Sequence, residues 1–329
     1  MFQGITKQLT TARKEVIRQQ ALNNFLDNLI KEQKTTKRNK KKITTKLSKA
    51  SIPDFDIEKA GAYPGLKALF FGVFGKQENE SDDSRQLFLK QYFLRQKLEE
   101  YEAELATLIQ QIEKEAASKR TISSLDRLTQ RIKENTQLKY HHQEVSSMFQ
   151  YVLKSAEIEG FIWLLEYTIE IGESIQNKLR EILRNLKTEA NWGSWELFDP
   201  TKKSALKIPA SGIDKAFSGV AQADALATAF HILSPPFLFN NSLTSHHEKI
   251  PGYKEVFIKS ILFDWLEGGG TKTTVLKTRQ LSSYIHAILH ALKETVQKKK
   301  TEFSLMEMER ENAIKRAEQL VEREKKAEL

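Results

Sequence analysis

Two histidines one helical turn apart, His286 and His290, have a spacing that lets one helix offer two ligands to a metal ion. No glutamate follows His286, so the zinc-protease pattern is absent. The Ala- and Leu-rich stretch around the pair offers no third ligand. We therefore expect both histidines at core or boundary positions of a helix, and we predict no metal site and no cofactor.

A second candidate is the string Gly-Gly-Gly-Thr-Lys-Thr-Thr at residues 268–274, which has the composition of a phosphate-binding loop. No glycine directly precedes Lys272, and the residues before the loop have a helical pattern, whereas a phosphate loop follows a strand. The chain also has no cysteine, which excludes disulfides and thiolate chemistry. We predict no catalytic residue and expect a non-enzyme; an enzyme whose site is assembled only by the fold is the alternative.

The strongest chemical signal is a run of basic residues near the start of the chain. Residues 1–60 hold 14 Lys and Arg against 6 Asp and Glu, whereas the whole chain carries a net charge of only +9. Clustered lysines bind phosphate groups by releasing counterions. We therefore interpret residues 31–50 as a solvated helix end or loop without a partner, and binding to an anionic membrane or a nucleic acid is the alternative. The candidate phosphate-binding residues are Lys37, Arg38, Lys40, Lys41, Lys42 and Lys46.

An apolar stretch follows at residues 63–75, with Phe70, Phe71 and Phe74 at its centre. A basic and an aromatic segment side by side are typical of proteins that bind a membrane surface, and some helical pore-forming toxins hide such an apolar tongue. The interpretation we favour is a buried loop that covers one end of a helical pack, since soluble proteins usually cover such patches.

Hydrophobic periodicity predicts helices over most of the chain, at residues 5–33, 84–116, from 122, 143–188, 214–231, 253–267 and from 273 onward. The second of these has a heptad seam with one polar interruption at Gln91, and a short polar break separates it from the next helix. We predict an all-α fold, an elongated helical bundle with an antiparallel coiled-coil hairpin; one long rod with a stutter is the competing interpretation. The predicted coiled-coil interface residues are Leu94, Leu98, Tyr101, Leu105, Leu108 and Ile112.

Beyond Phe303 the last helix is rich in charge, with a thin apolar stripe that includes Ala313 and Ala317. This tail either docks on the rest of the chain or projects from it. The expected division of the chain is an N-terminal helix with its basic arm, an apolar segment with an acidic linker, a coiled-coil hairpin, a helical core and a charged tail. These correspond to residues 1–52, 53–83, 84–142, 143–300 and 301–329.

The most distinctive string is Trp-Gly-Ser-Trp-Glu-Leu at residues 192–197. Together with Phe-Asp-Trp at residues 263–265 and the coiled-coil pattern upstream, it resembles a group of uncharacterised bacterial coiled-coil proteins with a W-G-[ST]-W-[DE]-L motif. The resemblance covers roughly residues 50–300. It implies a helical fold and carries no known activity or functional residues.

These patterns favour a helical scaffold or protein-interaction module whose partner is another protein, including a second copy of itself. No small-molecule substrate is indicated. The N-terminus lacks the apolar stretch of a signal peptide, and no apolar run is long enough for a membrane-spanning helix. We therefore expect a cytoplasmic protein, peripheral at a membrane if the basic arm binds one.

Overall fold

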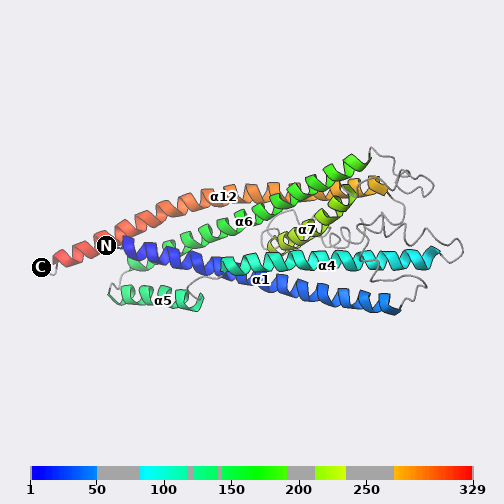
Figure 1. Ribbon diagram of the computed structural model, residues 1–329. Coiled ribbons are helices and arrows are strands. Elements are labelled where there is room, and N and C mark those ends of the chain that lie inside the picture. Colours follow the sequence, from blue (N-terminus) through cyan, green and yellow to red (C-terminus); the bar gives the residue numbers. More distant parts are fainter. Residues whose placement is uncertain are drawn as a thin grey trace. The chain divides into compact units, whose positions relative to one another are not determined.

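The computed structural model describes residues 2–49, 82–116, 122–139, 143–190, 212–234 and 270–327. These residues form six α-helices and contain no β-strand, which confirms the predicted all-α class (Figure 1). The helices are α1 (Gln3–Lys49), α4 (Asp82–Ala116), α5 (Ile122–Lys139), α6 (Gln143–Ala190), α7 (Gly212–Leu233) and α12 (Gly270–Ala327). None of the described helices is both long and apolar enough to cross a membrane.

Helix α1 is longer than its apolar pattern predicts, because it runs through the basic residues to Lys49. Neither glycine nor proline occurs between Gly4 and Pro53, so no residue breaks the helix. Threonine is a weaker helix former, but here its hydroxyls bond to the helix itself. The Oγ1 atoms of Thr35, Thr44 and Thr45 donate to carbonyl oxygens four residues earlier, at 2.9–3.0 Å.

The seam predicted on α4 lies on its packed side. Leu98, Tyr101, Leu105 and Ile112 are buried, and Leu94 and Leu108 are half-buried. Ile109 is buried as well, so the packed face is wider than a heptad seam. The antiparallel pairing of α4 with α5 stays a prediction.

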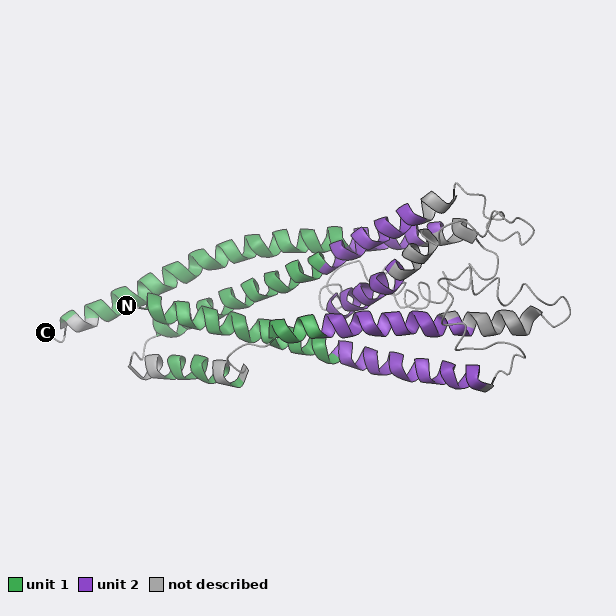
Figure 2. Cartoon of the chain, in the orientation of Figure 1, with its two compact units in different colours: residues 1–27, 110–170, 289–329 green, residues 28–109, 171–288 purple. Residues whose placement is uncertain are grey.

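The chain divides into two compact units (Figure 2). Unit 1 comprises Met1–Asp27, Gln110–Glu170 and Leu289–Leu329, and unit 2 comprises Asn28–Ile109 and Ile171–Ile288. Each unit therefore collects helix segments that are far apart in the sequence. The predicted helix at residues 253–267 lies outside the described residues.

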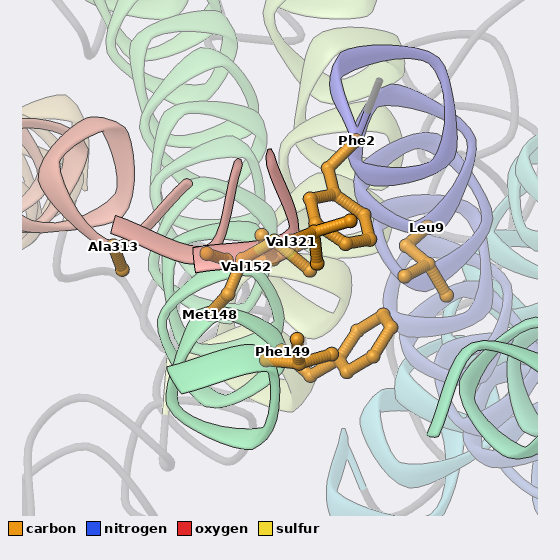
Figure 3. Close-up of a cluster of buried hydrophobic side chains, with 9 residues drawn as sticks. Phe2, Leu9, Met148, Phe149, Val152, Ala313 and Val321 are labelled. Carbon is orange, nitrogen blue, oxygen red and sulfur yellow. The ribbon is translucent and has the colours of Figure 1, made fainter. Parts of the chain in front are cut away.

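Unit 1 has an apolar core built from α1, α6 and α12 (Figure 3). Phe2, directly before α1, and Leu9 of α1 share one cluster with Phe149 of α6 and Ala317 of α12. All four side chains are at most 1% exposed. The charged tail predicted to dock or to project is thus docked, at least as far as Val321. Helix α5 joins this unit through Leu128, which packs against Ala12 and Val16 of α1, and through Ile132, which packs against the core cluster.

Unit 2 is organised around α7, whose residues from Gly219 to Leu233 are buried except for four half-buried ones. This helix is rich in alanine, and five of its buried residues between positions 221 and 229 are alanines. A Cβ atom added at Gly219 would lie 3.1 Å from Cγ1 of Ile182 in α6, so α6 and α7 approach closely there. Small side chains let neighbouring helices surround α7 without leaving voids.

Candidate functional site

The basic residues of α1 fall on the side of the helix that faces away from its packed side. Leu29, Thr36 and Leu47 are at most 3% exposed and mark the packed side in unit 2. At 3.6 residues per turn, the exposed basic residues lie on the opposite side. These six side chains form what we call the basic face: Lys31, Lys34, Arg38, Lys41, Lys42 and Lys46.

The basic face is straight and continuous. From residue 31 to residue 46 the helix rises about 22 Å, at about 1.5 Å per residue. Within residues 31–49 the sequence contains nine Lys or Arg and one acidic residue, Glu32. None of the six side chains of the basic face forms an ion pair with another residue that the structure describes.

Two of the predicted phosphate-binding lysines have a different role. Lys40 Nζ lies 2.6 Å from Oε2 of Glu102 on α4, and 3.9 Å from Oε1 of Glu99. Lys37 Nζ lies 3.7 Å from Oε1 of Glu102. The Glu102 side chain is only 17% exposed, so these contacts are partly shielded from water and help hold α1 against α4. Four of the six predicted residues, those at positions 38, 41, 42 and 46, remain on the basic face.

The single acidic residue of this stretch is directed into unit 2. Glu32 accepts a hydrogen bond from the hydroxyl of Tyr101 on α4, and that hydroxyl also lies 2.7 Å from Oγ1 of Thr228 on α7. Tyr101 is 3% exposed, and this burial raises its pKa far above the usual value for tyrosine; the nearby carboxylates of Glu32 and Asp224 raise it further. A phenol so deeply buried is neutral at physiological pH and closed to a substrate. The cluster joins three helices and has no feature of a reactive centre.

Phe70, Phe71 and Phe74 are outside the described residues, as is the whole apolar stretch at residues 63–75.

The expectation for the two histidines is wrong, because both are exposed on α12. The packed side of α12 is formed by Ile285, Leu289 and Leu292, and each histidine is one residue further round the helix. His290 Nδ1 lies 3.6 Å from Oε1 of Glu294. Among the described residues, no group of three or more His, Asp or Glu side chains could hold a metal ion.

Unit 1 contains an open groove of about 510 Å³ between α1 and α12. Its walls carry three cationic side chains, among them Arg310 and Lys315, and two carboxylates. The hydroxyls of Thr10 and Thr11 point back to their own helix, where they donate to carbonyl oxygens at 2.9 Å. Charges of both signs and satisfied hydroxyls give this groove no clear preference for a ligand.

The basic face is therefore the described surface with the most uniform chemistry. Sequence reasoning identified the charge but could not separate paired lysines from free ones. The string at residues 192–197 lies outside the described residues, and the resemblance drawn from it stays a prediction. Comparison of the chain with protein-family models, with curated proteins and with solved structures found no match.

Proposed function

We propose that this protein acts through contacts on its helix surfaces, as an interaction module without catalysis, and that the basic face of α1 binds a phosphate-bearing polyanion. One observation carries the proposal. Six cationic side chains are exposed along about 22 Å of one helix side, while the opposite side of the same helix is buried in unit 2.

The energetics of the free helix support this proposal. Five pairs of basic residues on this face are neighbours at three- or four-residue spacing: 31 with 34, 34 with 38, 38 with 41, 38 with 42, and 42 with 46. Each such pair destabilises a helix by about 0.2–0.5 kcal/mol, so the five pairs together oppose the helix by about 1–2.5 kcal/mol. A polyanion placed along this face would neutralise the charges and remove that repulsion. Binding and helix stability are therefore coupled in the same direction.

The test measures binding of the full chain to inorganic polyphosphate. Fluorescence anisotropy gives the binding constant at each of a series of salt concentrations. The test variant replaces Arg38, Lys41 and Lys42 by Gln. Loss of three phosphate contacts should lower the slope of log K against log [salt] by about 2–3 and weaken binding at low salt.

A matched control removes the same charges from α12, with Lys298→Gln, Arg316→Gln and Lys326→Gln, all at exposed positions. The control should bind as the unchanged protein does. Equal binding by the test variant and the unchanged protein would show that the basic face is not the site.

Self-association is a second candidate function, and it has its own observation. Leu305 and Met308 on α12 are 62% and 63% exposed and lie one turn apart. Light scattering at micromolar concentration should then give a mass above that of one chain, and replacing both residues by Ser should return it to one chain. A single-chain mass for the unchanged protein would exclude this function at that concentration.

A further inference from the structure

We infer that the polyanion that fits the basic face is an anionic lipid bilayer, on which α1 lies flat through its exposed side. The inference rests on the proposed function, because it takes polyanion binding by the basic face as given. It goes further in choosing one kind of macromolecule, and the choice follows from the shape of the charged surface.

A straight line of charge is a poor match for a nucleic acid duplex. The phosphate backbones wind around the duplex once in about 34 Å. The basic face is about 22 Å long, so a line of that length along the duplex meets each backbone at most once. Most of the six cations would then lie over a groove, away from phosphate.

The major groove is also closed to this helix. It admits a single α-helix whose sides are free, whereas α1 has one side packed in unit 2 and α4 beside it.

Single-stranded nucleic acid also finds no side chain on this face on which its bases could stack. Such strands bind where bases stack on aromatic side chains beside a basic groove. Residues 31–49 contain no aromatic residue, and their only large apolar residues are Ile43 and Leu47. Leu47 is buried and Ile43 half-buried, so neither can receive a base.

A bilayer satisfies the same line of charge completely. Anionic lipids diffuse within the leaflet, so each of the six cations can gather its own headgroup. The exposed side carries no apolar residue that would insert, and the attraction is therefore electrostatic and reversible by salt. Each Lys or Arg close to an anionic leaflet strengthens binding about fivefold.

The experiment is co-sedimentation of the full chain with vesicles of 70% phosphatidylcholine and 30% phosphatidylserine, at low and high salt. Pure phosphatidylcholine vesicles are run in parallel. We expect binding to the anionic vesicles alone, with release at high salt. The variant Arg38→Gln with Lys42→Gln should bind roughly 30-fold more weakly, and Arg316→Gln with Lys326→Gln on α12 should bind as the unchanged chain does.

A second arm separates this inference from the proposed function. The same proteins are titrated with a 30-base-pair duplex and with polyphosphate at the same salt concentrations. Binding to polyphosphate or duplex without binding to anionic vesicles would overturn the bilayer inference and leave the proposed function standing. Failure to bind any of the three would overturn both. Vesicle binding that Arg38→Gln with Lys42→Gln leaves unchanged would also overturn the inference, because another surface would then carry it; circular dichroism confirms that each variant is folded.

Discussion

Replacing Tyr101 by Phe tests the hydrogen-bond chain that joins α1, α4 and α7 in unit 2. The Tyr101 hydroxyl donates to the carboxylate of Glu32, which only accepts when ionised. The 2.7 Å contact with Thr228 must then have the threonine hydroxyl as donor and Tyr101 as acceptor. The tyrosine is thus the middle member, with one charged and one neutral hydrogen bond.

This order predicts unequal effects for the two ends of the contact. Tyr101→Phe removes both hydrogen bonds, one of them to a charged group. Because Glu32 is half-buried and keeps access to water, we expect a loss of about 1.5–2.5 kcal/mol in the free energy of unfolding. Thr228→Val removes only the neutral bond and leaves Tyr101 bonded to Glu32, so the expected loss is about 0.5–1 kcal/mol.

The assay is urea denaturation followed by circular dichroism at 222 nm for the two single variants and the double variant. Since both single changes break the same contact, the double variant should lose less than the sum, with a coupling of about 0.5–1 kcal/mol. A larger loss for Thr228→Val than for Tyr101→Phe would refute the assigned order of the bonds, and strict additivity would refute the contact itself. Leu276→Ala, at an exposed site, should change stability by less than about 0.5 kcal/mol.

Three further predictions concern close packing and pH. Gly160→Ala should destabilise the protein by about 1 kcal/mol in urea denaturation, because a Cβ atom there lies 3.0 Å from Cγ2 of Ile17. The overpacking costs about 1–3 kcal/mol and outweighs a helix-propensity gain of about 1 kcal/mol. An Ile17→Ala background should reduce or reverse the loss, and a stabilised single variant would contradict the close approach. Phe149→Ala, at a side chain 1% exposed in the core of unit 1, should lose about 3–5 kcal/mol in the same assay, and a loss below about 1 kcal/mol would contradict its burial. The free energy of unfolding should fall above pH 10, because burial raises the pKa of Tyr101 above 10 and the pKa of Tyr167 to about 12, so that unfolding releases protons there. The decline measured between pH 10 and 12 should be shallower in Tyr101→Phe, by about 1.4 kcal/mol per pH unit. An unchanged decline would contradict the raised pKa of Tyr101.

Local sequence patterns were sufficient for the class and limits of most helices. The starts of α4, α5 and α6 and both ends of α7 lie within two residues of the positions that apolar spacing and helix breakers indicate. Helix formation depends on neighbours three and four residues away, and this information is contained in a short window of sequence. The packed sides of α4 and α12 follow from the same periodicity.

The missed length of α1 has a different cause. Residues 34–49 carry few large apolar groups, so periodicity predicts a helix end. The structure continues the helix because Leu47 finds a buried position and because Lys40 meets Glu102 on α4, more than sixty residues further along the chain. No local window contains that partner.

The same limit applies to the candidate site. The sequence alone predicts the all-α fold, places most of the positive charge near the start, and indicates no catalytic motif. Only the tertiary structure decides which lysines are neutralised by α4 and which stay exposed on the basic face, and only it places Tyr101 against Thr228. A helix is specified by contacts between near neighbours, whereas a surface or a buried contact is specified by which distant segments pack together.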